Sequence, residues 1–135
     1  MERHPPPAQA TLHLDGKPGS TTAARHHAEG FLGRLNPPLP PALVQDAVLV
    51  ISELVSNAVR HAPGPCALDL LRQDQDLLIA VTDTSPVAPV PRDPDLLAGN
   101  GGFGMRLLER LGDETTVRTH RDGKTVTVLL RGAPR

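Results

Sequence analysis

The stretch ALVQDAVLVISELVSNAVRHA, residues 42–62, decides the fold. Its apolar side chains recur at intervals of three and four residues, which is typical of a helix with one broad buried face. Pro41 precedes the stretch and suits the first turn of a helix, and the Pro-Gly-Pro run at 63–65 ends it. The pattern therefore predicts one long core helix, and the rest of the chain must supply the surface on which it packs.

A line of polar side chains runs along this apolar helix. Glu53, Asn57 and His61 stand four residues apart, and Asp46 comes seven residues before Glu53. Steps of four keep side chains on one helical face. Taken alone, the line is either a solvated face or part of a site. In a site, the carboxylate accepts a proton from an attacking hydroxyl, the amide oxygen ligates Mg²⁺, and the imidazole contacts phosphate or caps the helix end.

A strand and a second helix are predicted before the core helix. Residues 1–10 contain three consecutive prolines and are expected to be a disordered tail. Residues 11–15 alternate between apolar and polar types, as a short strand does. A helix is expected from about Ser20 to the proline-rich residues 36–41, which remove backbone donors and fix φ.

Two hairpins are predicted after the core helix. The first consists of residues 66–73 and 76–84, and the second of residues 115–121 and 124–132. Strands pair with their sequence neighbours, and helices come in blocks. The sequence therefore predicts an α+β fold, a two-layer sandwich of a mostly antiparallel sheet with helices on one face. We expect one such domain over residues 11–132.

A long proline-rich segment at about 85–101 separates the two hairpins. Structureless connections of this length are uncommon in compact domains and are usually lids or binding loops. The sequence GGFGMRLL, residues 101–108, then opens another predicted helix. Its glycines let the backbone approach a ligand, and the first turn of the helix offers amide donors to an anion.

Two further features lie at the ends of predicted strands. Asp83 ends an apolar strand, where it is either a turn former or a carboxylate that accepts a hydrogen bond from an exocyclic amino group. Adenine carries such a group at N6 and guanine does not. Gly123-Lys124-Thr125 opens the last strand and, alone, predicts only an ordinary hairpin turn.

Composition narrows the class of protein. The 135 residues carry 14 Lys+Arg against 15 Asp+Glu, which argues against a general nucleic-acid binder. With two Phe and no Trp or Tyr, base stacking is not expected, and Cys66 has no partner for an internal disulfide. The N-terminus lacks the apolar run of a secretory signal, and charges interrupt residues 42–62. We expect a cytoplasmic protein without a membrane helix.

Taken together, these motifs resemble the ATP-binding domain shared by gyrase-type topoisomerases and histidine kinases, called the GHKL or Bergerat fold. Among its members the chain is most similar to the stand-alone anti-sigma factor kinases of bacterial partner-switching systems. The resemblance covers about residues 12–130. The matching motif residues are Glu53, Asn57, Ala58 and His61 on the helix, Asp83, then Gly102, Gly104 and Leu107, and finally Gly123 and Thr125.

The resemblance implies a role for each of these residues. Glu53 is the expected catalytic residue that polarises the nucleophile, and Asn57 the expected Mg²⁺ ligand. Asp83, backed by Thr125 and a water, is expected to read adenine. The ATP-binding residues implied are Asn57, His61, Asp83, Ser85, Gly102, Phe103, Gly104, Met105 and Thr125. Ser85 stands where the family usually has the glycine of Asp-x-Gly.

The resemblance also implies a function. ATP and Mg²⁺ would be the cofactors of a serine/threonine protein kinase that binds a sigma factor and phosphorylates a small anti-anti-sigma protein of the STAS type. The alternative is a weak or inactive ATP/ADP-binding interaction module, and a nucleotide-free scaffold follows if Ser85 closes the pocket. The first helix, with Arg25 as an exposed cation, would be the partner or homodimer surface.

Overall fold

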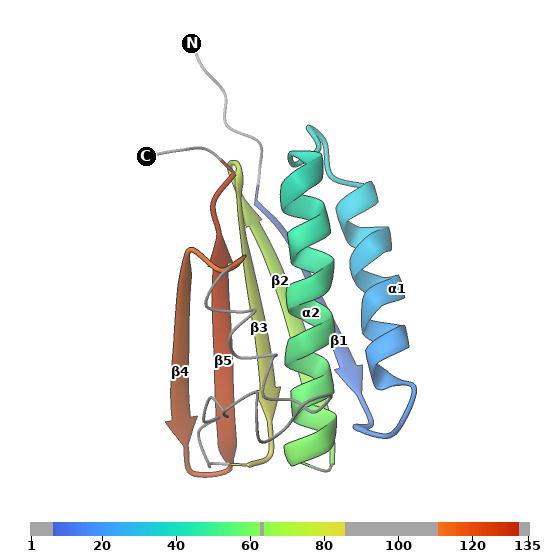
Figure 1. The fold of residues 1–135 in the computed structure, drawn as a ribbon, viewed down its shortest axis with the longest axis vertical. Coiled ribbons are helices and arrows are strands. Elements are labelled where there is room, and N and C mark those ends of the chain that lie inside the picture. The colour runs from blue at the N-terminus through green and yellow to red at the C-terminus, as the bar shows by residue number, and fades with distance from the viewer. Residues whose placement is uncertain (1–6, 63, 86–110, 133–135) are drawn as a thin grey trace, which may run out of the picture.

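The computed structural model describes residues 7–62, 64–85 and 111–132, and within them the fold has two layers (Figure 1). The strands form one antiparallel sheet in the order β1-β2-β3-β5-β4. Both helices cover the same face of this sheet. The predicted α+β sandwich is confirmed. Its elements are β1 (Ala8–Leu14), α1 (Ser20–Gly33), α2 (Pro41–His61), β2 (Cys66–Gln73), β3 (Asp76–Asp83), β4 (Glu114–His120) and β5 (Gly123–Leu130).

The core lies between α2 and the middle of the sheet. Strand side chains alternate between the two faces, so every second residue of β2, β3 and β5 points toward the helices. Burying each aliphatic side chain contributes roughly 1.5–3 kcal/mol. The fully or nearly fully buried members are Ala47, Val50, Ile51, Leu54, Val55 and Ala58 from α2, with Leu68, Leu70, Leu77, Ile79, Val81, Val126, Val128 and Leu130 from the strands.

Helix α1 lies beside α2 and runs in the opposite direction (Figure 1). The hydroxyl groups of Thr21 and Ser56 are 3.1 Å apart and join the start of α1 to the last turns of α2. Asp15 accepts hydrogen bonds from the Lys17 amide and the Ser20 hydroxyl just before α1 begins. These two bonds hold the pKa of the Asp15 carboxyl below its ordinary value.

Strand β1 is longer than the sequence predicted. It pairs with β2 from Ala8↔Arg72 to Leu14↔Cys66, so residues 8–10 belong to the sheet and are not part of a tail. The prediction was wrong there because pairing with β2 orders a segment whose own composition is weak in strand formers. The first six residues lie outside the described part of the chain.

Arg72 is a buried charge on the helix-facing side of β2. Its exposed fraction is 1%, and its guanidinium donates hydrogen bonds to the carbonyl oxygens of Pro37 and Asp74. The planar fork of an arginine suits two carbonyl acceptors at once. The side chain thereby ties the α1–α2 connection to the β2–β3 turn.

Helix α2 is long and apolar enough to cross a membrane by length and composition. In the structure, its apolar face packs against the sheet and α1. The apolar face of α2 is therefore covered by the rest of this domain, and this packing explains its apolar composition.

We predict that Ile51→Ala lowers the free energy of unfolding by about 3 kcal/mol, because it leaves a cavity beneath α2. Leu49→Ala is the matched control on the same helix. Ile51 is 0% exposed and Leu49 is 49% exposed, so the control should change stability by less than about 0.5 kcal/mol. Urea denaturation followed by circular dichroism measures both. Equal losses in the two variants would show that α2 is not seated on the sheet as described.

Candidate functional site

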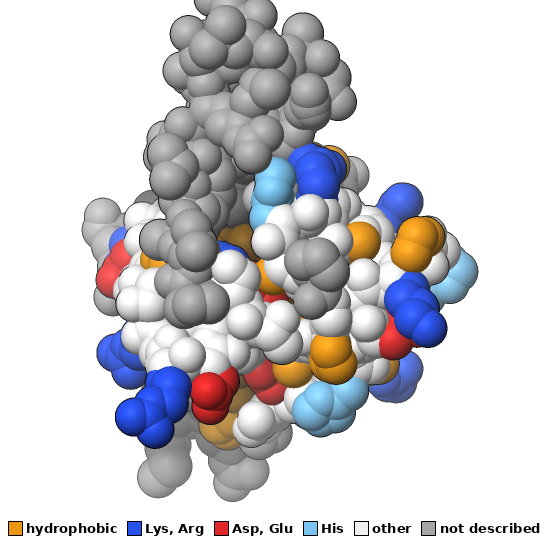
Figure 2. Space-filling model, turned by 90° about the horizontal axis from the view of Figure 1, so that it is seen from below, with side chains coloured by type: hydrophobic (Ala, Val, Ile, Leu, Met, Phe, Trp, Pro, Cys, Tyr) orange, Lys and Arg blue, Asp and Glu red, His pale blue; other side chains and the backbone are white. Residues whose placement is uncertain are grey.

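Several predicted site residues meet at one end of the sandwich. The C-terminal end of α2, the start of β2, the end of β3 and the start of β5 all lie there (Figure 1). Figure 2 looks onto this end, where acidic, basic and histidine side chains are interspersed and no single sign of charge dominates. The antiparallel pairing of β3 with β5 produces this meeting, because it brings Asp83 beside Lys124.

Asp83 lies on the helix-facing side of β3 and is 6% exposed. Its Oδ1 accepts a hydrogen bond of 2.9 Å from the Ser85 amide. Its Oδ2 lies 2.7 Å from Nζ of Lys124, and the exposed fractions of the two side chains are 7% for Lys124 and 4% for Asp83. The carboxylate predicted to read a base is therefore part of a buried ion pair.

The strand register explains why Lys124, and not Thr125, faces Asp83. Asp83 pairs with Lys124 and Thr82 pairs with Thr125, and neighbouring residues of a strand point to opposite faces. Thr125 therefore lies on the sheet face away from the helices, where its hydroxyl is 2.9 Å from that of Thr82 and 3.0 Å from Nε2 of His120. Among the described residues, the hydroxyl of Thr125 makes no hydrogen bond to Asp83, and the expectation that Thr125 and a water back Asp83 in reading adenine stays a prediction.

Gly123 permits this close approach of β5 to the end of β3. A Cβ atom on Gly123 would lie 1.9 Å from the carbonyl oxygen of Asp83 and 3.2 Å from Cα of Thr84. No side chain fits at those distances. Position 123 must therefore be glycine for β5 to place Lys124 beside Asp83.

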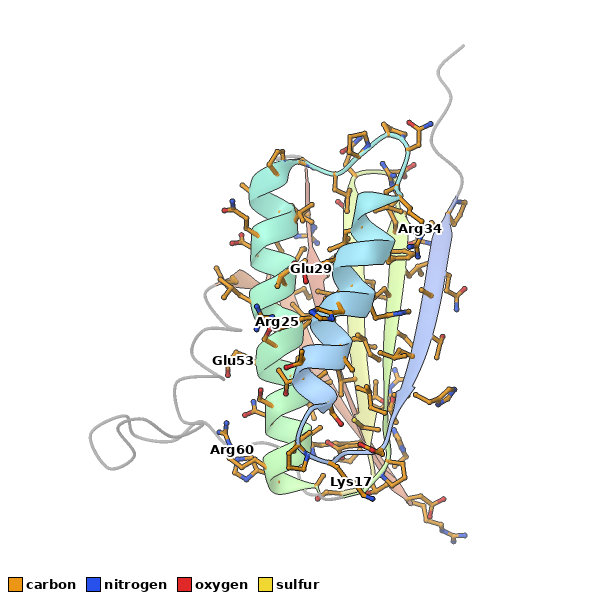
Figure 3. The ribbon with its side chains drawn as sticks, turned by 90° about the vertical axis from the view of Figure 1, so that its right-hand side faces the viewer. Lys17, Arg25, Glu29, Arg34, Glu53 and Arg60 are labelled. Carbon is orange, nitrogen blue, oxygen red and sulfur yellow. The ribbon has the colours of Figure 1, made fainter. Side chains whose placement is uncertain are left out.

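The polar line of α2 projects from the side of the helix away from α1. Figure 3 shows Glu53 and Arg60 on that side. Glu53 and Asn57 are half-buried, while His61 is exposed in the last turn. Within the described residues, Oδ1 of Asn57 is buried and has no hydrogen-bond partner, and the structure records no partner for the Glu53 carboxylate either. A buried amide oxygen without a donor is uncommon, and this makes Asn57 a candidate to bind a water, an ion or a ligand.

Cys66 is a buried neighbour of Asp83. Ala67 pairs with Thr82, so the preceding Cys66 and the following Asp83 lie side by side on the helix-facing side. Burial raises the pKa of the Cys66 thiol, and the nearby carboxylates of Asp83 and Asp15 raise it further. The thiol is therefore protonated at neutral pH and acts as a small apolar lining group.

The remaining predictions divide between described and undescribed residues. Ser85 is described, and its amide bonds Asp83 as stated above. The predicted phosphate-binding residues Gly102, Phe103, Gly104 and Met105, with most of the predicted lid, lie outside the described residues.

Sequence reasoning missed two residues of this site, Lys124 and Cys66. A signal for Lys124 was available, because Val126, Val128 and Leu130 are the buried positions of β5 and Lys124 shares their alternation. From the sequence alone, Cys66 indicates only that the chain has no internal disulfide. Its place beside Asp83 follows from the β2–β3 register, which the predicted hairpin already contained.

We predict that Lys124→Met lowers the free energy of unfolding by about 3 kcal/mol, because it leaves the buried Asp83 carboxylate without its counter-charge. The double variant Asp83→Asn, Lys124→Met should be more stable than Lys124→Met alone, since the buried charge is then removed. A double-mutant cycle from urea denaturation measures the coupling. Additive effects of the two substitutions would contradict the buried pair.

A solved structure of a known protein shares this fold. The crystal structure of the RsbU and RsbW domains of Rv1364c from Mycobacterium tuberculosis has a TM-score of 0.65 at 19% identity, over 92% of this chain and 32% of that one. The histidine kinase domain of the blue-light activated histidine kinase EL346 from Erythrobacter litoralis has a TM-score of 0.46 at 22% identity, over 67% of this chain and 45% of that one. This chain thus spans less than half of either protein chain.

The sequence itself matches a family along most of its length. The match covers residues 14–130, from the last residue of β1 to the end of β5, and it includes both helices, strands β2 to β5, the polar line of α2 and Asp83. The family is described as the histidine kinase-like ATPase domain, and this chain belongs to it.

Proposed function

We propose that this domain binds Mg-ATP and transfers its γ-phosphoryl group to a serine or threonine hydroxyl of a small partner protein. The observation that carries the proposal is the buried, unpartnered Oδ1 of Asn57 on the helix face that also bears Glu53. Membership of the histidine kinase-like ATPase family supports the choice of ATP. The buried Asp83 carboxylate at the same end of the sandwich would bind the base.

Asn57 fits the role of a Mg²⁺ ligand. Leaving a buried carbonyl oxygen without a donor costs about 1–3 kcal/mol, which a bound cation would offset. In the described parts of the chain, no group of three or more His, Cys, Asp or Glu side chains could hold a metal. Mg²⁺ readily accepts one or two protein oxygens together with water and phosphate oxygens, and it neutralises phosphate charge during transfer.

Glu53 fits the role of general base. Its carboxylate lies one helical turn before Asn57 on the same face, half-buried and pointing away from α1 (Figure 3). From there it would accept the proton of the attacking hydroxyl while α2 holds that hydroxyl in line with the phosphorus. The packing of α2 on the sheet fixes the backbone positions from which both side chains project.

We assign the class of partner protein from the resemblance of the motifs to those of the anti-sigma factor kinases. The domain would act as an anti-sigma factor, binding a sigma factor and phosphorylating an anti-anti-sigma protein of the STAS type. The likeness in fold to a protein with an RsbW domain supports this class. The outer face of α1, where Arg25 and Glu29 are exposed, is the surface proposed for the partner or for a second copy of the chain (Figure 3).

A second function is favoured by the Asp83–Lys124 pair. Because the base-reading carboxylate is already bonded, nucleotide affinity would be lower than with a free aspartate. In this alternative, the domain is an interaction module that binds ATP or ADP and a partner protein without turnover, and nucleotide shifts its conformational equilibrium.

We predict that Glu53→Gln removes phosphoryl transfer and spares nucleotide binding. Loss of a general base costs about 100-fold or more in rate, whereas the amide keeps the shape of the side chain. Transfer is measured with labelled ATP and a candidate STAS-type protein encoded nearby, and binding by calorimetry. Glu114→Gln, at an exposed carboxylate at the start of β4, is the matched control and should transfer at the wild-type rate.

Asn57→Ala should weaken binding of Mg-ATP about tenfold and have a much smaller effect on ATP measured in EDTA, since it removes the cation ligand. Transfer by Glu53→Gln at the wild-type rate would exclude Glu53 as the base. Nucleotide binding by the wild type without transfer to any co-encoded partner would favour the interaction module. Absence of nucleotide binding would favour the third hypothesis, a scaffold protein that binds no nucleotide.

A further inference from the structure

The Asp83–Lys124 pair is not explained by packing. The inward positions next to it on β3 and β5 are aliphatic, namely Val81 and Val126. Two buried charges cost more desolvation energy than a pair of apolar side chains of similar volume, which would often be equally stable or more so. A buried ion pair at this point of an aliphatic sheet therefore indicates a function in binding.

The pair retains hydrogen-bonding capacity. The Asp83 carboxylate accepts the Ser85 amide on Oδ1 and Lys124 on Oδ2, and each carboxylate oxygen keeps a second lone pair that could accept a further donor. The Lys124 ammonium has three N–H groups, of which one bonds Asp83 at 2.7 Å and another makes a long contact of 3.5 Å with the Ser85 carbonyl oxygen. The pair thus presents an acceptor and a donor side by side.

That arrangement complements the edge of a purine at positions 1 and 6. Adenine offers a donor at N6 and an acceptor at N1, whereas guanine and hypoxanthine offer an acceptor at O6 and a donor at N1. A carboxylate alone binds the 6-amino group and repels a 6-oxo group. A carboxylate with an adjacent ammonium can bind either purine. With adenine, the carboxylate accepts from N6 and the ammonium donates to N1. With guanine or hypoxanthine, the ammonium donates to O6 and the carboxylate accepts from N1.

We propose that Lys124 is a base-contacting residue of the nucleotide site, which together with Asp83 binds the 1,6-edge of the purine and admits 6-oxo purine nucleotides as well as ATP. This inference rests on the proposed function, because it needs a nucleotide to bind at this end of the sheet. Lys124 would replace a bridging water as the donor to adenine N1, and it would be the donor to O6 of guanine.

Selectivity arises when the wrong ligand leaves a buried polar group unpaired or repelled, and it can then reach several powers of ten. Lys124 removes that penalty for 6-oxo purines. The wild-type protein should therefore bind Mg-ATP and Mg-GTP with dissociation constants within about tenfold of each other. Lys124→Met keeps the length of the side chain without the ammonium, and it should raise the preference for ATP over GTP by about 100-fold.

Calorimetric titration of the full chain with Mg-ATP, Mg-GTP and Mg-ITP tests the proposal. Lys17→Met, at an exposed lysine in the β1–α1 connection, is the matched control and should leave the ATP:GTP ratio unchanged. The analogue 1-deaza-ATP lacks the N1 acceptor and should bind the wild type about tenfold more weakly than ATP. The wild-type ratio of ATP to GTP binding needs no variant, so it tests the proposal even if Lys124→Met does not fold.

Three results would overturn the inference. They are a wild-type preference for ATP over GTP of more than about 100-fold, an unchanged ratio in a folded Lys124→Met, and equal binding of 1-deaza-ATP and ATP. Each of them leaves the proposed function standing, because ATP still binds. Binding of no nucleotide at all would overturn the proposed function and this inference with it.

Discussion

The packing of α2 on the sheet is the constraint on which the site depends. Its buried face, with Ile51 and Val55 at the centre, contacts the aliphatic side chains of β3 and β5. A helix fixed by one face has its other faces fixed as well, since side chains four residues apart stay in line. The core therefore determines the side of α2 from which Glu53 and Asn57 project.

The second constraint is the register between β3 and β5. It places Asp83 and Lys124 on the helix side and Thr125 on the other side, and a slip of one residue would reverse all three. Gly123 holds this register at its end, where β5 touches the backbone of Asp83 too closely for any side chain. The electrostatic character of the base-binding end is thus a consequence of backbone pairing.

Local patterns in the sequence predicted most of the fold. Helix α2 runs from Pro41 to His61 as its periodicity and prolines indicated, and the first hairpin has nearly the predicted bounds. The start of β1 could not be predicted, because residues 8–10 become a strand only by pairing with β2, which is distant in the sequence. Tertiary pairing of this kind overrides weak local preference.

The candidate site was predicted only in part, because some of its features depend on pairing between strands that are distant in the sequence. The polar line of α2 and the end position of Asp83 are local features, and both lie where the sequence indicated. The partner of Asp83 is a non-local feature, because β5 lies next to β3 in the sheet while β4 comes between them in the chain. A motif matched by residue type alone selected Thr125, whereas the strand alternation selects Lys124.

Under the proposed function, the residues that would bind the base and those that would bind the metal have separable effects. Interactions with the base are the same in the ground state and the transition state, so a change at Asp83 or Lys124 alters which nucleotide binds and how tightly. Under the proposed function, Glu53 would act where charge develops during transfer and so alter the rate of the chemical step, while Asn57 would hold the cation that accompanies the phosphates. An unusual base reader is therefore compatible with an intact phosphoryl-transfer apparatus. The Asp83–Lys124 pair alone does not make this domain inactive, because the side chains that would perform the chemistry project from α2 and the pair lies on β3 and β5.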